Sequence, residues 1–176
     1  VYDSSTESAK SLVVSILAIF IESGAPVFFT QERVGRGGRI FRCLKLRTMR
    51  VDAERDGVAR WATAGDSRVT RVGRILRKLR IDELPQLINV LIGDMSLVGP
   101  RPPIPSEVEH YTWWQRRRVS VKPGLTCVWQ VWGRNRVSFK RWVEMDLYYI
   151  DNWSLWFDLR ILALTLWHIL KSRNAR

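Results

Sequence analysis

The sequence contains few of the residues on which many enzymes and small secreted proteins depend. It has two cysteines, Cys43 and Cys127, and two histidines, His110 and His168. Two cysteines give no sign of a disulfide scaffold or a zinc site, and two histidines argue against a histidine-rich metal centre or a serine triad. Any catalysis must therefore rest on carboxylates, lysines and arginines.

The sequence also lacks the run of about 20 apolar residues that a helix needs to cross a bilayer, and it shows no cleavable signal peptide. The apolar segment at residues 12–21 reads LVVSILAIFI. As a helix it would measure about 15 Å, half of a bilayer core. The chain begins at Val1 and not at methionine, so we expect it to be cut from a longer protein with more membrane sequence upstream.

Positive charge and tryptophan, in contrast, are abundant. Lys and Arg number 29 against 17 acidic residues, which gives a net charge of +12, and there are nine tryptophans. A surplus of this size predicts an anionic partner, namely nucleic acid, anionic lipid or a phosphorylated small molecule. The tryptophans favour a lipid headgroup layer, where amphipathic rings and basic side chains are both stable.

The length and the hydrophobic content of 46% suit one domain with a real core. The residue pattern predicts a mainly helical α+β fold with a small β-hairpin. The expected strands are 27–29 and 39–46, separated by glycine turn positions, and 125–131 is expected to be extended. The expected helices are 12–21, broken by the sequence SGAP after it, 68–80, one that begins at Asp82, 107–118, 139–150 and 155–170.

The strongest local candidate for chemistry is the acidic pair Asp82–Glu83, which follows the basic segment 68–80. Pro85 and the apolar spacing after it predict that the pair starts a helix, where unpaired amide hydrogens keep a carboxylate ionised and attract phosphate. An ionised aspartate beside a diphosphate is a competent nucleophile once positive charge screens the repulsion. The groups available for screening are Arg77, Lys78, Arg80 and a magnesium ion. The alternative is an ordinary N-cap aspartate.

Further basic residues are candidates for phosphate contacts. Arg101 stands between prolines in the sequence GPRPP, so its guanidinium is presented from a stiff backbone, as suits a phosphate clamp. The others are Lys45 and Arg47, which share one face of the second expected strand, and Arg134, which lies in a glycine turn. Each is equally explained, by itself, as a solvated surface charge.

Five blocks of sequence carry a family resemblance. They are PVFFTQERVG (26–35), KLRTM (45–49), IDELPQLINVLIGDMSLVGPRP (81–102), VKPGLTCVWQVWGRN (121–135) and DLYYIDNWS (146–154). In these blocks, and in their order along most of residues 22–170, the chain resembles the catalytic domain of the bacterial sugar transferases, the monotopic polyprenyl-phosphate phosphoglycosyl transferases.

The resemblance implies a reaction and a role for each candidate. In that family the aspartate of the acidic pair attacks the β-phosphate of a UDP-sugar, releases UMP and holds the phosphosugar until undecaprenyl phosphate accepts it, the first membrane step of exopolysaccharide, capsule or O-antigen assembly. Asp82 would be the nucleophile, and Glu83, with Asp82 beside it, would bind Mg²⁺. The residues implied to contact phosphates or the nucleotide are Lys45, Arg47, Arg77, Arg101 and Arg134, and Asp146 matches a further functional acidic position.

The resemblance also implies a place on the cytoplasmic face of the bacterial inner membrane. Residues 1–25 would form a membrane-associated helix of the re-entrant type, here truncated, and residues 26–176 the catalytic domain. Ser11-Leu12 stands roughly where the family has a Ser-Pro break, and polar residues at 3–10 replace the usual apolar first half. The chain thus departs from the family in this helix and agrees with it in the active-site blocks. Association with a second copy of the chain is left open.

Three other functions remain to be distinguished. An enzyme could transfer the phosphosugar directly, with Asp82 as metal ligand or base and no covalent adduct. The net charge of +12 with interleaved aromatics also suits a nucleic-acid-binding module, although an acidic pair amid the basic residues would repel a phosphate backbone. An inactive scaffold at the membrane surface is the third.

Overall fold

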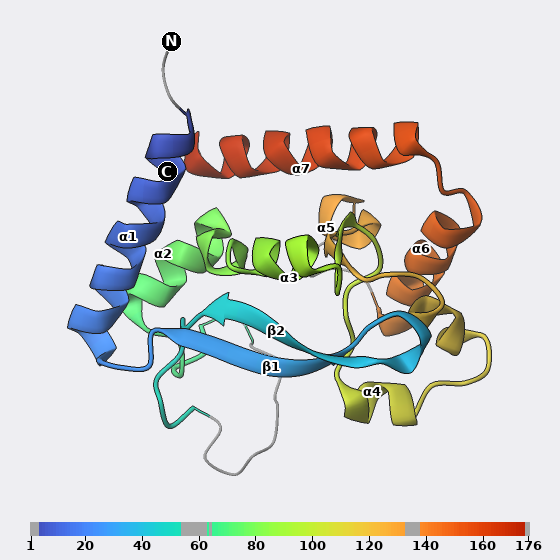
Figure 1. Cartoon of the computed structure of the whole chain (residues 1–176), viewed down its shortest axis with the longest axis horizontal. Helices are drawn as coiled ribbons and strands as arrows, with labels where there is room; N and C mark the ends of the chain where they lie inside the picture. Colours follow the sequence, from blue (N-terminus) through green and yellow to red (C-terminus); the bar gives the residue numbers. More distant parts are fainter. Residues whose placement is uncertain (1–3, 54–62, 64, 133–137, 175–176) are drawn as a thin grey trace. The chain divides into compact units, whose positions relative to one another are not determined.

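The computed structural model describes residues 4–53, 63, 65–132 and 138–174 (Figure 1). Its α-helices are α1 (Ser4–Ser23), α2 (Arg71–Leu79), α3 (Gln86–Ile92), α4 (Pro105–Glu109), α5 (Val128–Trp132), α6 (Phe139–Asp151) and α7 (Leu155–Asn174). The 3-10 turns are η1 (Arg36–Gly38), η2 (Ile81–Glu83) and η3 (Gln115–Val119), and the strands are β1 (Phe28–Val34), β2 (Ile40–Leu46), β3 (Ser96–Val98) and β4 (Gly124–Thr126). Helices with small sheets confirm the expected fold class.

The chain forms two compact units, which are described separately. Unit 1 comprises Val1–Phe29 and Lys45–Pro85, and unit 2 comprises Thr30–Leu44 and Gln86–Arg176. The units divide the chain differently from the boundary at residue 25 that the sequence suggested. A membrane-associated role for residues 1–25 stays a prediction.

Unit 1 is built from α1 and α2 packed together. Its core is Ile19, Leu46 and Leu76, and the apolar side chains packed on it are Leu12, Ile16, Val27, Val72 and Ile81. The predicted break after α1 is confirmed, because Gly24 adopts φ +68°, a conformation that a residue without Cβ reaches at no steric cost. Its N–H donates to Phe20 O at 2.9 Å and closes the helix end.

A second apolar surface of α1 stays exposed. The side chains concerned, with exposed fractions of 54–83%, are Val13, Val14, Leu17, Phe20 and Ile21. Within the described residues, no helix combines the length and the apolar character that crossing a bilayer requires.

Unit 2 holds two apolar clusters. The smaller one consists of Phe41 and Cys43 from β2 and of Met95, and Val90 from α3 packs against it. The larger consists of Val98, Val128, Val131, Tyr149 and Ile161, to which β3 and helices α5, α6 and α7 contribute. Burial of both cysteines agrees with the expectation that they serve packing.

The β1–β2 pair is the predicted hairpin, with η1 at its turn. A second sheet was not predicted: β3 and β4 pair in parallel, with Ser96 opposite Gly124 and Val98 opposite Thr126. The close approach depends on two glycines. A Cβ on Gly124 would lie 2.1 Å from Gly99 N, and a Cβ on Gly99 would lie 2.8 Å from Gly124 N. No larger residue fits at either position without moving backbone.

Two predicted segments were wrong in unit 2. The expected helix 107–118 is divided between α4 and η3, because α4 ends at Glu109 and the His110 N–H caps its carbonyls. The segment 125–131, expected to be extended because it is rich in Val and Trp, is a strand only as far as Thr126 and then becomes α5. Burial of Val128 and Val131 in the larger cluster outweighs their strand preference.

Candidate active site

The acidic pair lies in the 3-10 turn η2, which follows α2 after one residue. That residue, Arg80, takes the left-handed conformation with φ 56° and ψ 21°, so the chain turns sharply before Asp82. Glu83 N donates to Arg80 O at 3.3 Å, and Leu84 N donates to Ile81 O at 3.1 Å. The prediction that an α-helix begins at the acidic pair is therefore wrong, since α3 starts only at Gln86.

Asp82 is nearly enclosed. Its exposed fraction is 9%. Burial, followed by repulsion from Glu83, raises the pKa of Asp82 to about 6, while Lys45 and Arg77 act in the opposite direction. The carboxylate is thus largely ionised at neutral pH and poorly hydrated, a combination that favours nucleophilic attack on an electrophile brought to it.

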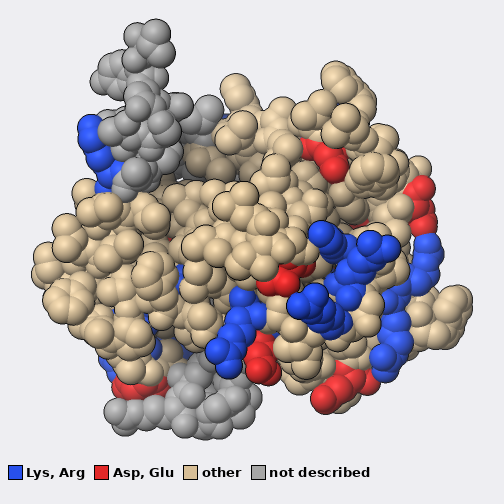
Figure 2. Space-filling model, viewed as in Figure 1, with Lys and Arg blue, Asp and Glu red and all other residues tan. Residues whose placement is uncertain are grey.

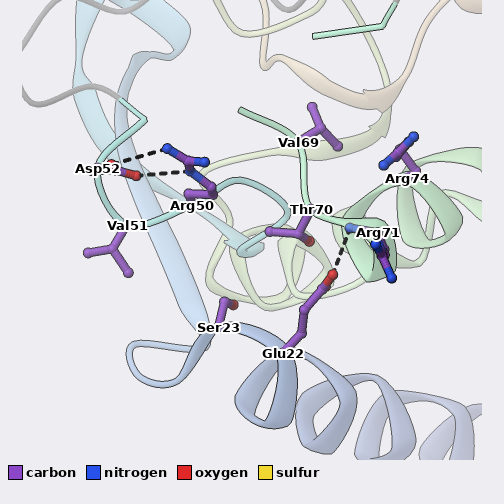
Figure 3. Close-up of a pocket in the computed structure, with 9 residues that line it drawn as sticks. All are labelled: Glu22, Ser23, Arg50, Val51, Asp52, Val69, Thr70, Arg71 and Arg74. Carbon is purple, nitrogen blue, oxygen red and sulfur yellow. Dashed lines mark hydrogen bonds and ion pairs between the residues drawn. The ribbon is translucent and has the colours of Figure 1, made fainter. Parts of the chain in front are cut away.

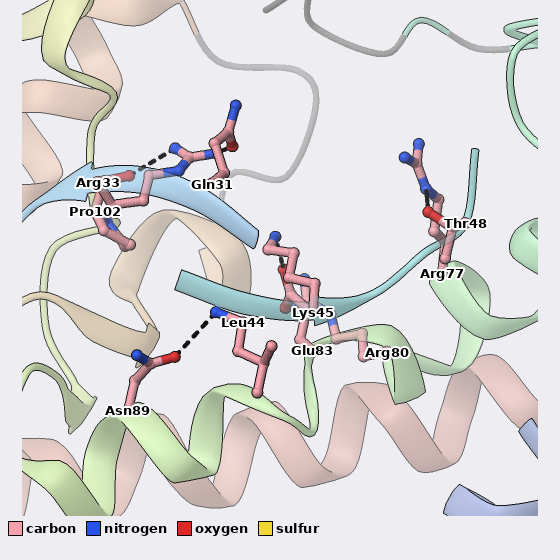
Figure 4. Close-up of polar contacts among 10 residues, drawn as sticks. All are labelled: Gln31, Arg33, Leu44, Lys45, Thr48, Arg77, Arg80, Glu83, Asn89 and Pro102. Atoms are coloured by element: carbon pink, nitrogen blue, oxygen red, sulfur yellow. Dashed lines mark hydrogen bonds and ion pairs between the residues drawn. The ribbon is translucent and has the colours of Figure 1, made fainter. Parts of the chain in front are cut away.

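Glu83 is held by two cations (Figure 4). Lys45 Nζ lies 3.1 Å from Glu83 Oε1, and Arg80 Nη1 lies 3.8 Å from Glu83 Oε2. Lys45 reaches the acidic pair from β2 and is the first residue of the second segment of unit 1. The structure therefore brings Lys45 to the acidic pair Asp82–Glu83, from which it is far apart in the sequence. The roles that the family resemblance implies for these three residues stay predictions.

Arg77 is the next predicted site residue in unit 1. Its Nε donates to Thr48 Oγ1 at 2.7 Å, and its charge lowers the pKa of Asp82. Thr48 is fixed against α2 because its carbonyl accepts from Thr70 N at 3.1 Å and because Gly73 presents no side chain there. A Cβ on Gly73 would lie 2.1 Å from Thr48 O. Thr48, which our sequence reasoning missed, thus orients Arg77.

Arg47 binds the end of α1 in this structure. It is 6% exposed, and its Nη2 donates to Ser23 O at 2.9 Å, to Ser23 Oγ at 3.0 Å and to Gly24 O at 2.6 Å. Its guanidinium satisfies carbonyls at the end of α1, where a helix leaves them unpaired. The predicted contact of Arg47 with a substrate phosphate stays a prediction.

Arg101 belongs to unit 2 and follows β3. Its guanidinium carbon lies 6.0 Å from the centre of the Trp129 ring and 5.7 Å from the Trp142 ring, both within the range of cation–π attraction. Arg134 lies outside the described residues, so its predicted role stays a prediction.

Asp146 is in unit 2 too, but it does not line an accessible site. Its side chain is 1% exposed and its Oδ2 lies 2.8 Å from Arg118 Nη2, whose own side chain is 0% exposed. Burial raises the pKa of Asp146, whereas Arg118 and the indole of Trp142 oppose the rise. In this arrangement the carboxylate of Asp146 is directed to Arg118 and not to solvent, and the functional role that the resemblance implies for Asp146 stays a prediction. Sequence reasoning missed Arg118 because it reads as one of three exposed arginines in a row.

A hollow of about 540 Å³ in unit 1 lies where α1 ends and α2 begins (Figure 3). Glu22 reaches the start of α2, accepting from Arg71 N at 2.8 Å and from Val72 N at 2.9 Å. Arg50 Nε donates to Asp52 Oδ1 at 3.3 Å. The residues that line the hollow are Glu22, Ser23, Arg50, Val51, Asp52, Val69, Thr70, Arg71 and Arg74. None of them is a site residue predicted from the sequence.

Charge on the surface is distributed in groups. Figure 2 shows Lys and Arg side chains on the viewed face with Asp or Glu beside several of them and broad uncharged areas between. Ion pairs between exposed side chains of unit 2 include Arg117–Asp151 and Arg141–Glu144.

Comparison with known proteins identifies the family of this chain. The family described as bacterial sugar transferase matches residues 7–172. The chain belongs to the bacterial sugar transferase family. It is 46% identical over 181 residues to a galactosyl transferase of Streptococcus agalactiae, covering 94% of this chain and 40% of the relative. It is 44% identical to a UDP-galactose-lipid carrier transferase of Erwinia amylovora, covering 94% of this chain and 37% of that protein.

A third relative is the UDP-glucose:undecaprenyl-phosphate glucose-1-phosphate transferase of Caulobacter vibrioides, 46% identical over 175 residues, with 95% of this chain and 65% of the relative covered. The chain therefore spans about two fifths of the Streptococcus and Erwinia proteins. Asp82 and Glu83 lie within the segment that the family matches.

The carboxylates of this sugar transferase also allow a test of the predicted Mg²⁺. Among the described residues, no group of three or more His, Cys, Asp or Glu is placed to hold a metal ion. Mg²⁺ in phosphoryl-transfer sites, however, takes one or two carboxylates and completes its shell with water and substrate phosphate oxygens. Burial and the neighbouring charge that raise the pKa of Asp82 are conditions that a cation relieves. The pair fits Mg²⁺ held jointly with a diphosphate.

Proposed function

We propose that this bacterial sugar transferase moves a sugar 1-phosphate from a UDP-sugar to undecaprenyl phosphate through a covalent intermediate on Asp82. The observation that carries the proposal is the turn η2, which presents a buried, ionisable aspartate beside a glutamate held by Lys45 and Arg80. The names of the Erwinia and Caulobacter relatives support the substrate classes.

In the first half-reaction, an Asp82 carboxylate oxygen forms a bond to the β-phosphorus of the UDP-sugar. The bond between that phosphorus and the bridging oxygen breaks, and UMP leaves with the electron pair. Lys45 and Arg77, whose charges already act on Asp82, reduce the repulsion between the carboxylate and the incoming diphosphate. Arg101 contributes a guanidinium suited to a phosphate oxygen pair.

In the second half-reaction, a phosphate oxygen of undecaprenyl phosphate attacks the phosphorus held on Asp82. The aspartyl–phosphorus bond breaks, the carboxylate is restored, and a lipid-linked diphosphate sugar is released. Mg²⁺, when bound with Asp82 and Glu83, supplies charge neutralisation to the diphosphate. Because both substrates are anionic, a single cationic site used twice in succession avoids binding them together.

The lipid acceptor requires a place at a membrane surface. The exposed apolar side chains of α1, from Val13 to Ile21, are suited to the acyl boundary of a leaflet, and the net charge of +12 is suited to anionic headgroups. We place the chain at the cytoplasmic face of the bacterial inner membrane on these grounds. The product would enter exopolysaccharide, capsule or O-antigen assembly.

The experiment that tests the proposal separates the two half-reactions. The protein with Mg²⁺ is incubated with a panel of UDP-sugars, first without and then with undecaprenyl phosphate, while UMP is measured. A stoichiometric burst of UMP without lipid, together with a phosphosugar mass on the Asp82 peptide, is expected. Asp82→Asn should give neither. Asp52→Asn is the matched control, because this aspartate of the same unit pairs with Arg50 away from the turn η2.

Two results would contradict the proposal in different ways. UMP release only when both substrates are present, with no adduct, favours direct transfer. An absence of UMP with every UDP-sugar, combined with steeply salt-dependent binding to DNA or RNA, favours the nucleic-acid-binding alternative.

A further inference from the structure

The backbone on either side of Arg101 is tied down within unit 2. Pro100 O accepts from Gly124 N at 2.9 Å. Pro102 O accepts from Arg33 Nη1 at 2.8 Å (Figure 4). Arg101 O itself accepts from Arg118 Nη2 at 3.4 Å. These hydrogen bonds fix the backbone of Arg101, but they do not fix the position of its guanidinium group.

Two indole rings lie against that guanidinium. The Trp129 and Trp142 centroids are 5.1 Å apart with the ring planes tilted by 55°, and the Arg101 guanidinium carbon lies 6.0 Å and 5.7 Å from them. A guanidinium held by ring faces is attracted through its charge and its planar face, and this contact does not consume its N–H donors. Such an arrangement suits a side chain that must present its edge to phosphate oxygens.

Trp142 is in turn fixed from another direction. It is 6% exposed, and the Arg118 guanidinium carbon lies 4.7 Å from its ring. Arg118 is neutralised by Asp146, with Nε 2.9 Å from Oδ2, and hydrogen-bonded to the hydroxyl of Tyr111. A second cation can share the Trp142 ring because the first is ion-paired; unpaired, the two guanidinium groups would repel each other.

We infer that Trp129 and Trp142 are positioning residues for Arg101, with the Arg118–Asp146 ion pair holding Trp142 in place. The inference rests on the proposed function, in which Arg101 contacts a phosphate of the UDP-sugar. It assigns Asp146 a role through Arg118 and Trp142, in place of a direct contact with substrate.

The test uses Trp129→Leu, because Trp129 is only partly buried, whereas Trp142 is buried. Removal of a cation–π partner should lower the second-order rate constant of the UMP burst, measured with the UDP-sugar and without lipid acceptor, by about 2- to 30-fold. The same change in an Arg101→Ala background should have little further effect, and Trp129→Phe should recover part of the rate. Trp113→Leu, at a ring that is 82% exposed, is the control and should match the wild type.

A role in stability alone predicts a different pattern. Trp129→Leu would then lower the rate by the same factor with Arg101 present or absent, and that result overturns the inference. Equal rates for Trp129→Leu and Trp113→Leu overturn it too. Thermal unfolding of all variants, including the buried Trp142→Phe, checks that each is folded at the assay temperature. A wild-type protein without UMP release from any UDP-sugar rejects the proposed function itself, and the positioning role with it.

Discussion

Lys45 Nζ and Glu83 Oε1 lie 3.1 Å apart, although 38 positions separate the two residues in the chain. Both side chains are about one quarter exposed, at 25% and 23%. A pair at this depth is screened by water less than a surface ion pair, and less costly to form than a fully buried one. It lies next to Asp82, whose pKa Lys45 lowers and Glu83 raises.

Replacement of Lys45 by methionine should lower kcat/KM for the UDP-sugar by about 100-fold, because one cation near the attacking carboxylate is lost while the shape of the side chain is kept. Lys45→Arg should lose less, since the charge remains. UMP release measures both. Lys140→Met, at an exposed lysine of α6, is the control. Loss of the same size in Lys140→Met would show that the effect is not local.

Gly73→Ala should destabilise the protein, contrary to the usual effect of alanine in a helix. In an unhindered helix the change stabilises by about 1 kcal/mol. Here the new Cβ would lie 2.1 Å from Thr48 O, a backbone atom that cannot rotate away. Overpacking of this kind costs about 3 kcal/mol, and urea unfolding measures it. Ile75→Ala, on the same helix and 59% exposed, should change stability by no more than about 0.5 kcal/mol. A free energy of unfolding for Gly73→Ala equal to that of the wild type would disprove the close contact.

Glu22 should make stability depend on pH in the acid range. Slight burial raises the pKa of Glu22, but the Val72 and Arg71 amides, the Thr70 hydroxyl and the Arg71 charge outweigh it, so the pKa is lowered overall. The folded chain therefore binds this proton less readily than the unfolded chain. The stabilisation is present above the unfolded pKa of about 4.3 and is lost as the pH falls through the lowered pKa.

Glu22→Gln should accordingly melt at a lower temperature than the wild type at pH 7. The reason is the loss of a contact at the start of α2 that contributes about 1 kcal/mol to the free energy of unfolding. The difference should narrow towards pH 3, when wild-type Glu22 is protonated. Thermal melts across this range measure it. Glu32→Gln, on the exposed side of β1, provides the comparison. A difference that stays constant with pH would contradict the assignment.

The exposed apolar side chains of α1 should govern binding to lipid. Phe20→Ser with Ile21→Ser removes two side chains that are 56% and 83% exposed. Binding to vesicles of phosphatidylglycerol and phosphatidylethanolamine should weaken at least about tenfold, because each large apolar side chain contributes about 2 kcal/mol when it leaves water. Co-sedimentation measures this. Ile75→Ser is the matched control on α2. Undiminished binding of the double variant would exclude α1 as the contact.

The sequence predicts the parts of this fold that depend on local pattern. Helices α6 and α7 follow from apolar periodicity, the break after α1 from Gly24, and the hairpin from its glycines. The acidic pair was found from its position after a basic helix and from the family's sequence blocks. These features are encoded within a few residues of where they occur.

Features set by distant contacts could not be predicted. Arg80, which precedes the 3-10 turn of Asp82, adopts φ 56° although it is not a glycine. The sequence therefore does not predict this turn. The parallel pairing of Val98 with Thr126 joins three-residue strands across a long connection. Arg47 and Arg118 read as surface charges, yet each is buried with partners that the tertiary structure alone supplies.

The side chain of Asn89 protects part of β2 from pairing with a strand of another molecule. Its side-chain Oδ1 accepts from Leu44 N at 3.0 Å, and its Nδ2 donates to Arg42 O at 2.8 Å, as a neighbouring strand would. These are groups through which an exposed sheet edge recruits a foreign strand and begins to aggregate. Because the amide of Asn89 occupies Leu44 N and Arg42 O, these two backbone groups of β2 are not available to a strand of another molecule. In a chain without the Asn89 side chain, both groups would lack this partner.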